Sequence, residues 1–167
     1  MITPDEIRAW FAGRVPTDWF VVPPEVTTDS EEVLIVGVLA DVASGSTAEA
    51  DRAAREARIK RFREESREQR MKIATEGELR FERRISWGAE CGDVRRLFTT
   101  ISVPVMTRLR LDERGVLDTL VDSGVARSRS DALAWCVRLV AKHQSDWIQS
   151  LRDALVKVEE VRSQGPR

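Results

Sequence analysis

The sequence predicts an α+β fold, in which β-rich runs and helical segments follow one another along the chain. Short clusters of β-branched and aromatic residues lie on both sides of a long segment dominated by Ala, Arg and Glu. Hydrophobic residues make up 42% of the 167 residues, which is enough to build a core. We therefore expect one globular domain, or a small domain with a sizeable appendage.

Residues 1–46 are expected to form an acidic module with one helix followed by two strands. Thr3 is a suitable N-cap, Pro4 fits the first helical position, and apolar residues then recur at helical spacing. Two β-rich runs, residues 19–22 and 32–39, are separated by turn-forming residues and predict a hairpin. Because the module has two basic against eight acidic side chains and no evident catalytic dyad, we interpret it as a packing or partner-binding element.

Residues 47–84 are predicted to form one long charged helix, set off from the first module by the Ser-Gly-Ser linker at residues 44–46. The segment is free of proline, and acidic side chains repeatedly precede basic ones by four positions, which stabilises a helix in water. The side chains of Arg63, Arg67 and Arg70 share one face and could bind phosphates. Interspersed glutamates weaken such a site, so a solvated charged face is the preferred interpretation.

Residues 85–104 are predicted to form a β-hairpin, because β-prone residues lie on both sides of a glycine-containing segment. The segment from Gly88 to Gly92 is interpreted as the turn of this hairpin. It lacks the pattern of a phosphate-binding loop, in which a lysine followed by Ser or Thr contacts the phosphates.

Residues 105–111 alternate in character, as a β-strand does when only one of its faces is buried. One predicted face is apolar and the other is largely basic. The first face carries Thr107, Leu109 and Leu111, and the second carries Met106, Arg108 and Arg110.

Two short amphipathic helices are expected after this strand. Asp112 offers an N-cap for the first helix, and Gly124 marks its end. Ser128 is the predicted N-cap of the second helix, and Asp131, three positions later, would complete a capping box. The apolar positions of the second helix extend to about Ala141.

The order strand, helix, turn and helix in residues 105–141 resembles the ribbon-helix-helix family of DNA-binding proteins. In that family, two chains pair their strands into an antiparallel ribbon that enters the major groove, and the helices form a shared dimer core. The remainder of the chain is loosely similar to uncharacterised Arg-rich actinobacterial proteins, and no function is inferred from that similarity.

The resemblance implies which side chains contact DNA. The outward face of the ribbon reads base edges, for which arginine is the commonest reader of guanine. The start of the second helix rests on backbone phosphates, which its free N–H groups and dipole would attract. The implied base-reading residues are Met106, Arg108 and Arg110, and the implied phosphate-binding residues are Ser128, Arg129 and Ser130.

A two-stranded ribbon requires a partner strand, so the resemblance predicts a homodimer. The alternative left open is a monomer in which residues 105–111 join the preceding hairpin. Residues 142–167 add a third amphipathic helix and a tail, and the apolar stripe of this helix should extend the dimer core as in a coiled coil.

We therefore expect a sequence-specific DNA-binding protein, a transcriptional regulator that binds double-stranded DNA as a homodimer. A protein partner for the N-terminal region is also considered. The alternative is a non-enzymatic dimeric scaffold that binds a protein or RNA through the charged helix of residues 47–84. An enzyme is disfavoured, because the chain has no tyrosine and only one histidine for acid–base chemistry.

Cofactors, metals and membranes are not expected. Cys91, Cys136 and His143 lack the spacing of a zinc site, so a metal centre would require the fold to assemble them. No apolar run is long enough to span a bilayer, and the acidic N-terminus is unlike a signal peptide. The expected location is the cytoplasm.

Overall fold

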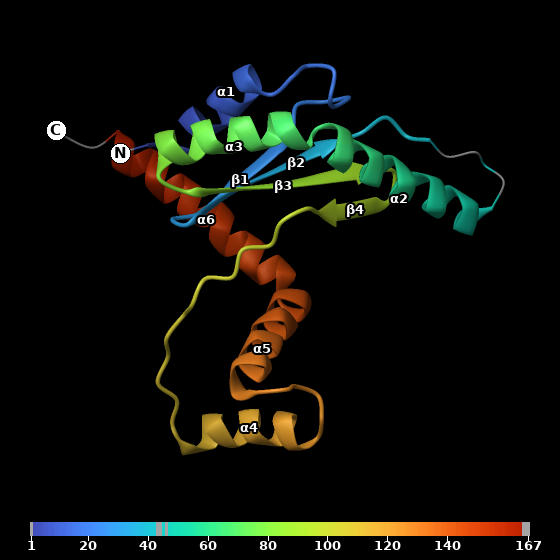
Figure 1. Ribbon diagram of the computed structural model, residues 1–167. Coiled ribbons are helices and arrows are strands. Elements are labelled where there is room, and N and C mark those ends of the chain that lie inside the picture. Colours follow the sequence, from blue (N-terminus) through green and yellow to red (C-terminus); the bar gives the residue numbers. More distant parts are fainter. Residues whose placement is uncertain (1, 43–44, 46, 165–167) are drawn as a thin grey trace. The chain divides into compact units, whose positions relative to one another are not determined.

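Two units make up the chain, the first over residues 1–104 and the second over residues 105–167 (Figure 1). The structure is a computed structural model and describes residues 2–42, 45 and 47–164. Two residues of the predicted linker, 44 and 46, lie outside the described part of the chain. The fold is mixed α+β, with the strands in unit 1 and helices in both units.

A four-stranded sheet with the order β1-β2-β3-β4 forms the centre of unit 1. Both outer pairs are antiparallel, whereas the central pair, β2 with β3, is parallel. The two predicted hairpins are therefore joined into one sheet. The strands are β1 (Glu25–Thr28), β2 (Glu32–Val38), β3 (Arg84–Cys91) and β4 (Val94–Leu97).

Three helices pack with this sheet: α1 (Pro4–Arg14), α2 (Ala48–Glu65) and α3 (Arg67–Phe81). Helix α1 begins as predicted, since Thr3 and Glu6 form a reciprocal capping box. The core contains Phe11 from α1 together with Ile73 and Phe81 from α3 and Trp87 from β3. A second cluster joins α2 to the other end of the sheet through Leu39, Ile59, Phe62, Ala89, Cys91 and Val94.

The prediction of one continuous helix over residues 47–84 is wrong, because the helix is interrupted at Ser66. The Ser66 hydroxyl donates a hydrogen bond to the carbonyl of Phe62 and accepts one from Nε of Arg70. A serine hydroxyl that bonds to the preceding turn in this way bends a helix. Ser66 is buried, so this junction is part of the core-facing side of α2 and α3.

Both hairpins differ from their predicted positions. The first strand lies at Glu25–Thr28 and not at residues 19–22, because Asp29 accepts hydrogen bonds from the N–H groups of Glu31 and Glu32 and closes a tight turn beside β1. The second turn lies at Gly92, whose φ of 57° suits glycine. Gly88 is instead a strand residue, where a Cβ would approach a methyl carbon of Leu97 to 2.8 Å.

Unit 2 consists of α4 (Leu111–Asp122), α5 (Arg129–His143) and α6 (Ser145–Ser163). Its small core contains Leu117 of α4, Ala132 of α5 and Ala126 of the connecting turn. Across the described residues, no helix has both the length and the apolar character that a bilayer crossing requires.

The predicted end of the first helix of unit 2 is confirmed, but its predicted start is not. Gly124, with a φ of 76°, follows α4 as expected of a helix terminator. Arg110 is the N-cap in place of Asp112, because the Glu113 carboxylate accepts a hydrogen bond of 2.7 Å from the Arg110 backbone and starts the helix earlier.

Candidate nucleic-acid interface

The segment before α4 exposes its basic side chains and anchors one apolar side chain. Met106 is 96% exposed, and Arg108 and Arg110 are also exposed. Leu109, between the two arginines, is partly buried and packs against the core of unit 2. A guanidinium N–H of Arg114 donates to the Leu109 carbonyl at 2.7 Å, which fixes the end of the segment to α4.

The predicted alternation holds at Leu109 but not on either side of it. Thr107 is exposed, and Leu111 is 74% exposed because it is the first residue of α4 and no longer part of an extended segment. In the single chain, residues 101–110 have no regular secondary structure. The strand of the expected ribbon would therefore have to form by pairing with a second chain.

Ser128 caps α5 as predicted. Its hydroxyl accepts a hydrogen bond of 3.2 Å from the backbone N–H of Asp131. The expected reciprocal bond differs, because the Asp131 carboxylate accepts from the backbone of Arg127, one residue before the cap, at 3.0 Å. Ser130 is exposed on the first turn of α5. This helix end is ordered by its own side chains and faces solvent.

Arg129 is held by an acidic partner that the sequence did not indicate. Its Nε and one terminal nitrogen donate to the two carboxylate oxygens of Asp118 in α4, at 2.6 and 2.8 Å. The hydrogen bonds from Arg129 hold the pKa of Asp118 below its ordinary value. Both side chains are substantially exposed, so a phosphate could replace Asp118 as the partner of Arg129 at little cost.

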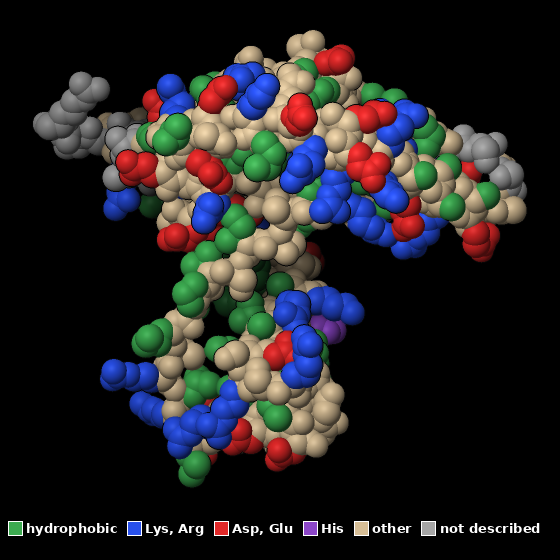
Figure 2. Space-filling view, in the orientation of Figure 1, with side chains coloured by type: hydrophobic (Ala, Val, Ile, Leu, Met, Phe, Trp, Pro, Cys, Tyr) green, Lys and Arg blue, Asp and Glu red, His purple; other side chains and the backbone are tan. Residues whose placement is uncertain are grey.

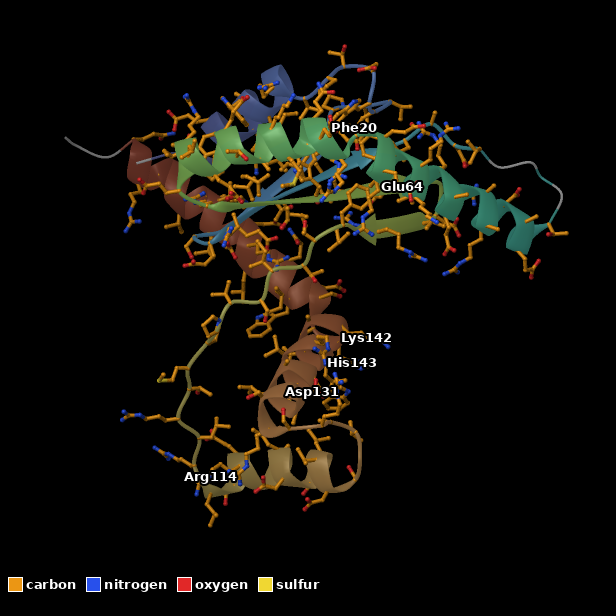
Figure 3. The ribbon with its side chains drawn as sticks, viewed as in Figure 1. Phe20, Glu64, Arg114, Asp131, Lys142 and His143 are labelled. Atoms are coloured by element: carbon orange, nitrogen blue, oxygen red, sulfur yellow. The ribbon has the colours of Figure 1, made fainter. Side chains whose placement is uncertain are left out.

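Basic side chains gather on the extended segment and around the start of α4, where acidic ones are also present (Figure 2). Arg114 lies at the start of α4, whereas Lys142 and His143 lie at the far end of α5 from Asp131 (Figure 3). The structure thus places Arg108, Arg110 and Arg114 along one stretch of unit 2. Arg114 was not among the predicted site residues. Only its closeness to Arg110 in the sequence indicated that it lies beside the basic segment.

Metal-binding groups are not assembled within the described residues. No three His, Cys, Asp or Glu side chains are grouped there so as to hold a metal ion. Cys91 is buried in β3 of unit 1, and Cys136 and His143 lie on α5 of unit 2. Burial raises the pKa of the Cys91 thiol, which suits a packing residue better than a reactive one.

Comparison with known proteins assigns each unit to a described domain. Residues 5–97 match the family described as the Rv1265-like protein, N-terminal domain, and residues 110–162 match the Mb1296 C-terminal domain. The chain is 54% identical, over 157 residues, to the uncharacterised protein Mb1296 of Mycobacterium bovis and equally to the uncharacterised protein Rv1265 of Mycobacterium tuberculosis. Each alignment covers 94% of this chain and 69% of the relative. No solved structure matches.

Proposed function

The chain belongs to the family of Rv1265-like proteins, and we propose that it acts in the cytoplasm as a DNA-binding homodimer and transcriptional regulator. In this proposal, unit 2 is of ribbon-helix-helix type. Residues 105–110 of two chains pair as an antiparallel ribbon in the major groove of double-stranded DNA, which is wide enough to admit one.

The observation that carries the proposal is the arrangement of Arg108, Leu109 and Arg110. The apolar side chain between the two arginines packs into the core of unit 2, while both guanidinium groups extend into solvent. A segment anchored in this way can present two arginines to base edges without losing its own packing. A unit that served only for dimerisation would not require these two charges.

Unpartnered apolar side chains in unit 2 support the homodimer. The core of this unit contains few buried residues, whereas many large apolar side chains remain exposed. Large apolar side chains left exposed in such number are typical of an interface. The exposed side chains lie on all three helices and are Leu111, Val116, Val137, Leu139, Val140, Trp147, Leu151, Leu155, Val156, Val158 and Val161.

We expect light scattering at micromolar concentration to give about twice the chain mass of 18.9 kDa, because a second chain completes both the ribbon and the apolar core. Leu155→Glu, which places a charge on the exposed stripe of α6, should shift the protein toward monomer. Arg152→Ala on the same helix should leave the mass unchanged. A monomer throughout the micromolar range would contradict the proposed ribbon.

The DNA-binding test compares arginines that should contact bases with one that should contact a phosphate. Genomic fragments captured by the protein provide the preferred sequence, and fluorescence anisotropy at several salt concentrations measures affinity. Arg108→Ala and Arg110→Ala should each lose about 1–3 kcal/mol on that sequence and relax its discrimination. Arg129→Ala should weaken all sequences about equally and lower the salt slope by about one.

Arg152→Ala in α6 serves as the matched control, since it removes the same charge from an exposed position outside the ribbon. Equal, sequence-independent losses for Arg108→Ala, Arg110→Ala and Arg129→Ala would show that the segment does not read bases. Unchanged DNA affinity in all three variants would exclude the segment from the DNA interface. That result would favour the scaffold alternative, in which the charged helices of unit 1 bind a protein or RNA.

A further inference from the structure

A basic groove lies within unit 1, between the helices α2 and α3, the strand β3 and the residues that follow β4. Its volume is about 530 Å³. The groove takes basic side chains from both helices and aromatic ones from the sheet side. Its polar lining residues are Lys60, Arg63, Glu64, Arg67, Arg70 and Thr99, and its apolar lining residues are Met71, Ala74, Ile85, Trp87 and Phe98.

Arg70 is the unusual member of this groove, because its positive charge is buried there and pairs with no acidic side chain of the described residues. The residue is only 7% exposed. It donates to the Ser66 hydroxyl at 2.8 Å and to the Arg63 carbonyl at 2.6 Å, and its guanidinium lies 4.7 Å from the centre of the Phe98 ring. All of these partners are neutral. Within the described part of the chain, no ion pair involves Arg63, Arg67 or Arg70.

A buried cation without a counter-ion is costly, and the neighbouring charges add to the cost. Burial, together with the like charges of Arg63 and Arg67, lowers the pKa of the Arg70 guanidinium to about 10, so the group stays charged at neutral pH. Among the described residues, Glu64 is the one acidic side chain that lines the groove, on the α2 side (Figure 3). The lining also contains four basic side chains, so the groove has an excess of positive charge.

Trp87, which lines the groove, has an unsatisfied polar group in its indole Nε1. It is buried and has no hydrogen-bond partner among the described residues. Phe98 supplies an aromatic ring that already lies near the guanidinium groups of Arg63 and Arg70, at 5.8 and 4.7 Å from its centre. The groove therefore combines excess positive charge with a flat apolar wall.

We propose that this groove binds a small organic anion, whose carboxylate or phosphate group contacts Arg67 and Arg70 and whose apolar part packs against Phe98. Arginine is suited to both kinds of group, because its planar fork of donors matches them. The residues that line the site all belong to unit 1, and none of them is part of the proposed DNA-binding segment.

Three probes separate the chemistry of the ligand in titration calorimetry with the whole 167-residue chain. Phenyl phosphate and benzoate each combine an anion with a ring, and inorganic phosphate offers the anion alone. Saturable binding of phenyl phosphate or benzoate, tighter than that of inorganic phosphate, is expected. The stronger of the two identifies the anionic group. Absence of saturable binding for all three probes at millimolar concentration would overturn the proposal.

Matched variants of α2 and α3 locate the binding. Arg67→Gln should weaken the better probe about tenfold, which corresponds to about 1.4 kcal/mol for one lost charged contact. Arg61→Gln removes an exposed arginine of α2 that pairs with Glu65 outside the groove, and should change affinity less than about twofold. Equal effects of the two variants would show that binding is only nonspecific charge attraction, and would overturn the site.

Arg70→Met tests the buried charge itself and keeps a similar side-chain volume. Binding should be lost while the thermal transition remains cooperative. If this variant fails to fold, the affinity of Arg67→Gln and Lys60→Gln for the better probe decides whether the site exists. The DNA assay keeps the two proposals apart: Arg67→Gln should leave DNA affinity within about twofold. A loss of DNA binding without a loss of probe binding would instead make the groove a nucleic-acid contact and overturn the small-anion site.

Discussion

Phe11→Ala should destabilise unit 1 by about 3–5 kcal/mol. Phe11 is fully buried, and its ring packs edge-on against Trp10 and Trp87, with centroids 4.7 and 6.3 Å away. It also contacts Phe81 of α3, so one side chain connects two helices to the sheet. Truncation removes both the buried surface and these aromatic contacts.

Urea denaturation followed by tryptophan fluorescence measures this loss, since Trp10 and Trp87 report directly on the core around the substituted residue. Leu79→Ala is the matched control, because Leu79 on α3 is 81% exposed and its truncation should change stability by less than about 0.5 kcal/mol. A similar midpoint for both variants would mean that α1 does not pack on the sheet as described.

Leu117→Ala should cost about 2–5 kcal/mol and largely unfold unit 2. Leu117 is 6% exposed and is the largest of the three buried residues in the core of this unit, where the others are alanines. A core this small provides only a few kcal/mol of stability, so the loss of one leucine removes most of it. Hydrogen exchange of the α4 and α5 amides should therefore accelerate strongly, and DNA binding should be lost with the fold.

Gly115→Ala provides a control of opposite sign in the same helix. Gly115 lies inside α4, and a Cβ at this position would meet no atom within 4 Å. The variant should stabilise α4 by about 0.5–1 kcal/mol, since alanine loses less conformational entropy than glycine in a helix. Slower exchange for Gly115→Ala and faster exchange for Leu117→Ala are expected. Faster exchange for Gly115→Ala than for Leu117→Ala would show that a different face of α4 packs against the core of unit 2.

Local signals in the sequence predicted two of the helix starts correctly. The capping residues Thr3 and Ser128 each bond to the third helical N–H, as their position before an apolar periodic segment indicated. These interactions lie within three residues along the chain, so a single sequence contains all of their determinants. The inward position of Leu109 was likewise predicted, but the alternation expected of Thr107 and Leu111 did not hold.

Long-range pairings could not be predicted in this way. The parallel contact of β2 with β3 depends on how α2 and α3 cross between the two strands, and neither strand carries a local sign of its partner. The Arg129–Asp118 pair joins two helices, and Asp118 resembled any polar residue on an exposed face. The basic groove had a partial signal in Arg63, Arg67 and Arg70, but the aromatic wall provided by Phe98 comes from another part of the chain.

The parallel pairing of β2 with β3 also determines the order in which the molecule can fold. Val33 pairs with Ile85, so the central contact of unit 1 closes a loop of about fifty residues. Closing this loop costs conformational entropy before the strand pairing can stabilise the fold. Unit 2 is built from helices joined by short turns, and its core contacts are close in sequence. Unit 2, although it follows unit 1 in the sequence, should therefore reach its native contacts on a faster timescale than the central sheet.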